Sequence, residues 1–175
     1  FHNNTATYIY ANQRRQAPED WNCARLFRTA AQFLRDNARR DNFFLWVDSF
    51  DPHEPWDAPP EFVKMYVHEP GFDGRIDPRA FLPDARNPVD APDPDAVRNR
   101  LKALYAAKVS WMDHCLGKLL EAMDEKGLWD NTAVILTSDH GTNVGDRGRF
   151  GKTAPVHDSE ARVPMMIYAP GAGAG

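Results

Sequence analysis

A short run of β-branched and apolar residues that ends in Asp139-His140-Gly141 constrains this chain more than any other feature. Residues 132–137 are all apolar or β-branched, which is typical of a strand buried on both faces. In open α/β sheets, ligands collect just beyond the carboxyl ends of such strands. The run therefore predicts that a carboxylate and an imidazole lie at one sheet edge, together with the loop that leads to Lys152.

Two stretches have the apolar spacing of amphipathic helices. The first covers about residues 21–39, and the second about 96–126, with Asp95 as the expected amino cap and Gly127 as the expected carboxyl cap. Between them lies a short apolar run, residues 43–48, which predicts a central strand.

This order of elements predicts an α/β fold with a mostly parallel sheet and helices on its faces. We expect three segments to be neighbouring strands of one sheet, flanked by helices near 21–39 and 97–126. These segments are residues 43–48, 132–138 and 163–168.

A proline-rich region covers about residues 52–95, since ten of the fourteen prolines fall between 52 and 94. Proline lacks the amide proton that helices and sheets use, so this region is predicted to be mostly loop. Only residues 61–67 suggest a short helix. No repeat or second domain is indicated, so residues 1–175 are interpreted as belonging to a single domain.

Composition is that of a globular chain, with 42% hydrophobic residues and a net charge of -4. No basic cluster suggests a nucleic-acid partner, and no apolar stretch is long enough to span a membrane. Cys23 and Cys115 lie in unrelated helical contexts, which indicates buried apolar residues and not a disulfide framework.

Several motifs together resemble the sulfatases, which belong to the alkaline phosphatase-like superfamily. The matching segments are Ser138-Asp139-His140-Gly141, then residues 145–152, then Arg162-Val163-Pro164, and upstream residues 43–56, where an apolar run leads into a histidine-proline loop. Residues 105–132 match the segment that precedes the aspartate-histidine motif in that family. The resemblance covers most of the chain.

The resemblance also implies that the chain is an internal fragment. Sulfatases carry an amino-terminal aspartate pair and a Cys/Ser-x-Pro-x-Arg nucleophile motif, and neither Cys23 nor Cys115 has that spacing. A formylglycine nucleophile is therefore expected outside this chain. The remainder of its own catalytic domain is the expected partner, and the isolated chain is expected to be inactive.

Asp139 and His140 have two interpretations. They could simply cap the turn after a strand, but with the glycine-rich loop and Lys152 downstream we favour a metal site, because carboxylate and imidazole are competent ligands of divalent cations. The resemblance implies that both residues complete a site for calcium, with manganese or zinc as alternatives. Two ligands alone are expected to bind metal weakly.

Lys152 and His53 are the candidate catalytic and substrate-binding residues. Either residue could be an ordinary surface side chain. The resemblance implies that Lys152 binds the sulfate group and that His53 binds it and protonates or hydrogen-bonds the leaving oxygen, a task suited to an imidazole. If so, both residues must open onto one pocket with Asp139 and His140.

The sequence therefore favours a metal-dependent hydrolase of sulfate esters, acting on a small molecule or a glycan. The alternative in the same superfamily is a phosphoryl hydrolase, either a phosphonate monoesterase or a phosphodiesterase. A third hypothesis is that the chain is a non-catalytic structural fragment.

Overall fold

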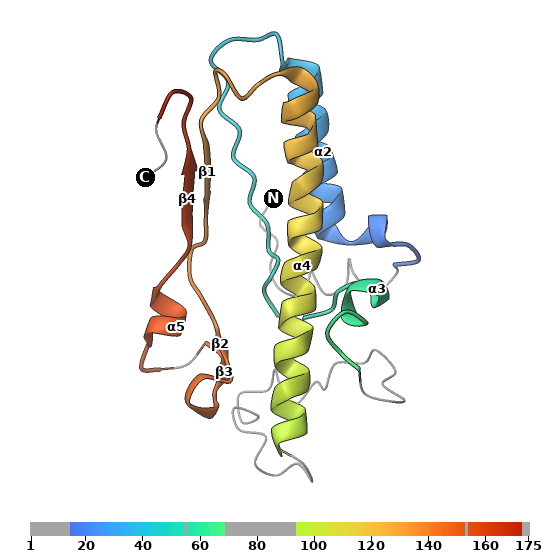
Figure 1. Cartoon of the computed structure of the whole chain (residues 1–175), viewed down its shortest axis with the longest axis vertical. Helices are drawn as coiled ribbons and strands as arrows, with labels where there is room; N and C mark the ends of the chain where they lie inside the picture. Colours follow the sequence, from blue (N-terminus) through green and yellow to red (C-terminus); the bar gives the residue numbers. More distant parts are fainter. Residues whose placement is uncertain (1–14, 55, 69–93, 153, 173–175) are drawn as a thin grey trace.

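Two long helices dominate the computed structural model. The structure describes residues 15–54, 56–68, 94–152 and 154–172. Helix α2 (Asn22–Asn37) and helix α4 (Pro94–Lys126) pack together and run in the same direction (Figure 1). Near their carboxyl ends, Arg35 Nε donates to Glu125 Oε2 at 2.8 Å. Both helices confirm the prediction from the spacing of apolar residues.

The two ends of α4 differ in how well the sequence predicted them. Asp95 is not the amino cap, because the helix begins one residue earlier, at Pro94; proline suits a first helical position, which needs no amide donor. The predicted cap at Gly127 is confirmed. Its φ is 61°, and the amide of Leu128 donates to the carbonyl of Met123 at 3.0 Å, which closes the helix end.

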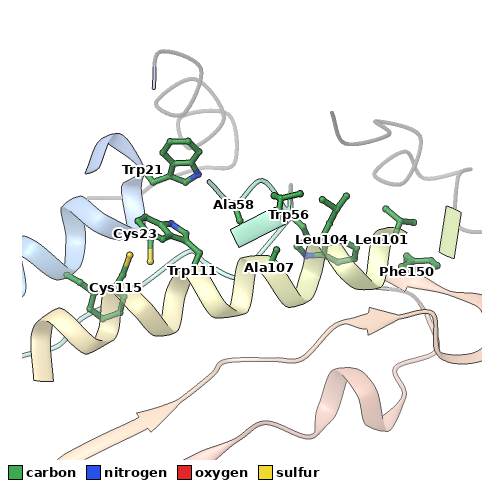
Figure 2. Close-up of a cluster of buried hydrophobic side chains, with 12 residues drawn as sticks. Trp21, Cys23, Trp56, Ala58, Leu101, Leu104, Ala107, Trp111, Cys115 and Phe150 are labelled. Atoms are coloured by element: carbon green, nitrogen blue, oxygen red, sulfur yellow. The ribbon is translucent and has the colours of Figure 1, made fainter. Parts of the chain in front are cut away.

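Aromatic side chains fill the larger of two core clusters (Figure 2). Trp21, at the start of α2, meets Trp111 of α4 edge to face with ring centroids 6.3 Å apart. Trp56 packs in the same manner against Tyr105 at 5.4 Å. The smaller cluster lies further along the helix pair and consists of Ala31, Leu34, Ala122, Met123 and Leu128.

Both cysteines are buried, as predicted, but their contexts are not unrelated. Cys23 of α2 and Cys115 of α4 face each other within the larger cluster (Figure 2). The hydrogen bond with Cys115, together with burial, raises the pKa of the Cys23 thiol well above its ordinary value. Sequence spacing could not show this contact, because it depends on the alignment of the two helices.

The described strands form two small antiparallel sheets. Strand β1 (Val134–Thr137) pairs with β4 (Met165–Tyr168), with Val134 opposite Tyr168, and β2 (Asn143–Val144) pairs with β3 (Phe150–Gly151). The predicted pairing of the last two apolar runs is confirmed, but the mostly parallel sheet is not. A hairpin and the short helix α5 (Asp158–Ala161) connect β1 to β4, and no helix crosses the sheet between them.

The prediction of a central strand at residues 43–48 is wrong for the described structure. This segment is extended but belongs to no ladder, and in Figure 1 it runs between β1 and α4. Phe43, Leu45 and Val47 pack against the core clusters, whereas Phe44 and Trp46 are 83% and 74% exposed. The segment thus covers the helices with one face only.

The expectation that β1 is buried on both faces is also wrong. Ile135 is 64% exposed, whereas its neighbour Val134 packs against the smaller cluster. One face of β1 therefore rests on the core, whereas all four residues of β4 are exposed.

The remaining elements are short. They are the turns of helix η1 (Pro18–Asp20), α3 (Pro60–Val63) and η4 (Asp146–Gly148). The short helix predicted at residues 61–67 corresponds to α3 and the turn after it. None of the helices in the described ranges is both long enough and apolar enough to cross a membrane.

Two glycines, one within helix α4 and one at its carboxyl cap, should respond in opposite ways to an added methyl group. A Cβ on either Gly117 or Gly127 would meet no atom within 4 Å, but only Gly127 has a left-handed φ, 61°. Gly117→Ala should stabilise the chain by about 0.5–1 kcal/mol, as expected within a helix. Gly127→Ala should destabilise it by about 1 kcal/mol. Urea unfolding measures both, and equal signs would contradict the assignment of the cap.

Candidate active site

The loop that carries His53 is anchored to helix α4 by a buried ion cluster. The Nζ of Lys108 lies 2.9 Å from Asp51 Oδ1 and 3.0 Å from Asp57 Oδ1, and the lysine side chain is 0% exposed. A buried charge is stable only when it is paired and hydrogen-bonded. Both carboxylates flank the histidine in sequence, so the cluster fixes the loop on each side of it.

Asp57 connects this cluster to the amino-terminal side of the core. Its carboxylate also meets Arg15 at 2.8 Å, and its carbonyl accepts from the indole Nε1 of Trp21 at 2.8 Å. The His53 loop is therefore held by side chains from both long helical regions, although the segment itself has little regular structure.

His53 stacks on Phe50 with ring centroids 4.2 Å apart, and its Nδ1 lies 2.8 Å from the carbonyl of Glu54. Its Nε2 lies 3.0 Å from the Nζ of Lys152. An ammonium has only donors, so Nε2 accepts this bond and Nδ1 carries the ring proton. The contacts thus specify one neutral tautomer.

Glu54 belongs to the same group, although no sequence motif singled it out. Its Oε2 lies 2.5 Å from Lys152 Nζ and 3.0 Å from His53 Nδ1, while Oε1 accepts from the hydroxyl of Thr142 at 3.2 Å. Burial by itself would raise the pKa of Glu54, but the hydrogen bond from Lys152 and the neighbouring charges outweigh it and hold that pKa below its ordinary value.

The hairpin formed by β2 and β3 explains why Thr142 and Lys152 meet the same carboxylate. Asn143 pairs with Gly151, and Thr142 and Lys152 are the next residues outward on the two strands. The side chain of Asn143 reinforces this end, because its Nδ2 donates to the carbonyl of Gly151 at 2.8 Å and its Oδ1 accepts from Ser159 at 2.5 Å.

Asp139 and His140 follow β1 after one intervening residue, Ser138. The amide of His140 donates to Asp139 Oδ1 at 2.9 Å, and His140 Nδ1 lies 2.7 Å from the carbonyl of Gly141. When Nδ1 donates to this carbonyl, Nε2 keeps a free lone pair, as in histidines that bind metals. Nε2 lies 3.8 Å from Asp139 Oδ2, and the aspartate side chain is 87% exposed.

The donor set of Asp139 and His140 fits two ligands of a divalent cation, an oxygen and an imidazole nitrogen. No group of three or more potential ligand side chains occurs among the residues that the structure describes. Two ligands form only part of a coordination sphere, because calcium takes six to eight oxygen ligands.

Gly141 fixes the position of this pair against α5. A Cβ at this residue would lie 2.2 Å from the carbonyl oxygen of Ser159, which no side chain can tolerate, and its amide donates to the carbonyl of Glu160 at 2.7 Å. The glycine is therefore required by close approach of two backbones.

The structure brings His53 and Lys152 into direct contact and keeps Asp139 next to His140. The two pairs are linked indirectly. Gly141 and Thr142 follow His140 in sequence, and the hydroxyl of Thr142 donates to Glu54, which contacts His53 and Lys152. Direct contacts between the pairs are not seen among the described residues. That all four residues open onto one pocket stays a prediction.

Sequence reasoning missed the residues that hold the site together, namely Glu54, Lys108, Thr142 and Asn143. Lys108 looked like one polar residue within a helical pattern, and only its position opposite Asp51 reveals its role. The sequence feature that could have indicated these contacts is the group of acidic residues around His53.

Comparison with known proteins identifies the wider class. A phosphonate monoester hydrolase from Silicibacter pomeroyi has a similar structure, with a TM-score of 0.72 at 26% identity over 90% of this chain and 34% of that one. This likeness places the chain among proteins with an alkaline phosphatase-like fold.

Sequence relatives narrow the class further. The mouse iduronate 2-sulfatase is 34% identical over 148 residues, 74% of this chain and 27% of that protein. The arylsulfatase of Clostridium perfringens is 31% identical over 166 residues, 88% of this chain and 32% of that protein. The chain thus spans about a third or less of these relatives.

The model of the sulfatase family matches residues 1–175, and the chain belongs to this family.

Replacing Lys108 should test the anchor of the His53 loop. Lys108→Met removes the ammonium that pairs with the buried Asp51, and we expect a loss of about 3–5 kcal/mol in the free energy of unfolding. Urea denaturation gives this value. The matched control is Lys118→Met on the same helix, where the exposed ion pair with Glu121 should contribute less than about 1 kcal/mol. Similar effects of both substitutions would contradict the proposed anchor.

Proposed function

We propose that the protein to which this chain belongs is a metal-dependent hydrolase of sulfate esters, acting on a small molecule or a glycan. The observation that carries the proposal is the contact between Lys152 Nζ and His53 Nε2 at 3.0 Å. In a chain of the sulfatase family, this contact joins two residues, 99 positions apart in sequence, that the motif resemblance assigns to the same anion.

In this proposal Lys152 holds the sulfate oxygens as a positive point charge, and His53 binds the same group. The Nε2 of His53 is the atom that would carry a proton to the leaving oxygen. When Nε2 is protonated, Glu54 Oε2 stabilises the resulting imidazolium, because it lies 3.0 Å from Nδ1.

Asp139 and His140 would hold the divalent cation, which we take to be calcium, with manganese and zinc as alternatives. The cation supplies electrostatic stabilisation of the negative charge that grows on the ester oxygens. The nucleophile of the proposal is a formylglycine outside this chain. This chain therefore needs the rest of its catalytic domain as a partner. On its own it is inactive.

A phosphoryl hydrolase is the second candidate function. What favours it is the similarity to the phosphonate monoester hydrolase, which has the same fold at 26% identity. A phosphonate ester presents oxygens much like those of a sulfate ester. Assays of the whole protein on aryl sulfates and aryl phosphonates, measured side by side, separate the two functions. A non-catalytic role would be supported by the absence of turnover on both.

The contact between His53 and Lys152 leads to a direct test by mutation. In the whole protein, His53→Ala and Lys152→Ala should each lower kcat/KM for an aryl sulfate by roughly 10²–10⁴-fold, because proton transfer and charge stabilisation are lost. His68→Ala and Lys64→Ala, which alter exposed side chains, serve as matched controls. Activity within about twofold of the unaltered protein would overturn the assignment.

The two-ligand metal pair predicts weak binding by the 175-residue chain. We expect calcium, manganese and zinc to bind with dissociation constants above about 10⁻⁴ M in isothermal titration, since most of the coordination sphere is missing. No hydrolysis of aryl sulfate is expected. Micromolar calcium binding that is abolished by Asp139→Ala, but retained in the exposed control Asp130→Ala, would show that further ligands lie within this chain.

A further inference from the structure

We propose that Glu54 selects substrates by charge, favouring esters that carry one negative charge over esters that carry two. The inference rests on the proposed function, because it takes His53 and Lys152 as the residues that bind the ester. It goes beyond the proposed function in two respects. It names the Glu54 carboxylate as the group that determines specificity, and it defines the substrate class by its charge.

Glu54 is held where it must influence any anion bound by this pair. One carboxylate oxygen contacts both Lys152 Nζ and His53 Nδ1, and the other accepts from Thr142. His53 belongs to the His53 loop, Thr142 lies just before β2, and Lys152 lies just after β3. The Glu54 side chain is only 12% exposed, so solvent screens its charge poorly.

The charges of this group nearly cancel. Lys152 contributes one positive charge and Glu54 one negative charge, and His53 is neutral until its Nε2 takes up a proton. An anion beside Lys152 therefore also meets a fixed negative charge a few ångströms away. The repulsion that Glu54 itself exerts is proportional to the charge of the ligand, so Glu54 opposes the binding of a dianion twice as strongly as that of a monoanion.

The substrates of the two candidate functions have the same charge. Sulfate monoesters and phosphonate monoesters each carry a single negative charge, whereas phosphate monoesters carry close to two above their second pKa of about 6. Glu54 should therefore lower the preference of the site for the third class relative to the first two.

The test compares three esters with one leaving group, 4-nitrophenol, on the whole protein at a pH of about 8, well above that second pKa. These are the sulfate, the phenylphosphonate and the phosphate. The last two share a phosphorus centre but differ in charge, so their ratio separates charge from the identity of the reacting atom. Glu54→Gln removes the charge with little change in shape, and Glu54→Asp retains it.

In Glu54→Gln, kcat/KM for the phosphate relative to the phenylphosphonate should rise about tenfold or more over the unaltered protein. In Glu54→Asp, the ratio should stay close to the original value. Glu61→Gln, at an exposed position of α3, controls for the net charge of the protein. A merely structural role of Glu54 would lower all rates and leave the ratio unchanged, which would overturn the proposal.

Failure of the proposed function has a different signature. It would appear as absence of sulfate turnover in the unaltered protein, whereas the charge rule is judged on the phosphate to phosphonate ratio. If none of the esters is hydrolysed, dissociation constants of phenyl phosphate and phenyl sulfate replace the rates. A gain in affinity for the phosphate that is confined to Glu54→Gln supports the rule, and equal changes for both ligands refute it.

Discussion

The buried ammonium of Lys108 is the constraint on which the candidate site depends. A charge with no exposure to solvent needs anionic partners, and the only segment that supplies them here, among the described residues, is the loop around His53. The position of the loop thus follows from the electrostatics of helix α4 and not from any regular structure of its own. Because α4 also contributes residues to both core clusters, the same helix supports the site and the core.

The second half of the site depends on hydrogen-bond geometry. The short β2–β3 hairpin aligns Thr142 with Lys152, and Asn143 ties that hairpin to α5. Glu54 then joins the hairpin to the anchored loop. The anchored loop and the hairpin, which are far apart in sequence, thus meet at one carboxylate. This explains how a region with few strands can hold an ammonium beside an imidazole.

The sequence predicted the parts that depend on local rules. Helices α2 and α4 follow from periodic apolar residues, and the end of α4 follows from the conformational freedom of Gly127. His53 and Lys152 were found through resemblance to a family, since an isolated histidine or lysine carries little information. The contact between them could not be predicted from spacing, because 99 positions separate them.

Other features lay beyond the reach of sequence reasoning for a physical reason. The direction of strand pairing depends on which backbones lie alongside each other, and an apolar run such as residues 43–48 looks the same with or without a partner. Likewise, Lys108 and Cys115 occupy ordinary positions in a helical pattern, and only the alignment of α2, α4 and the loop reveals what faces them.

The uncovered strands have a practical consequence for work with this chain. Ile135, Met165 and Ile167 expose their side chains on the β1–β4 ribbon, and Phe44 and Trp46 do so on the extended segment nearby. Apolar strand surfaces with free backbone edges are templates for pairing with other molecules. Produced on its own, the chain is therefore prone to self-association and precipitation. A lower solubility of the isolated chain than of the whole protein would indicate that these surfaces are covered in the whole protein.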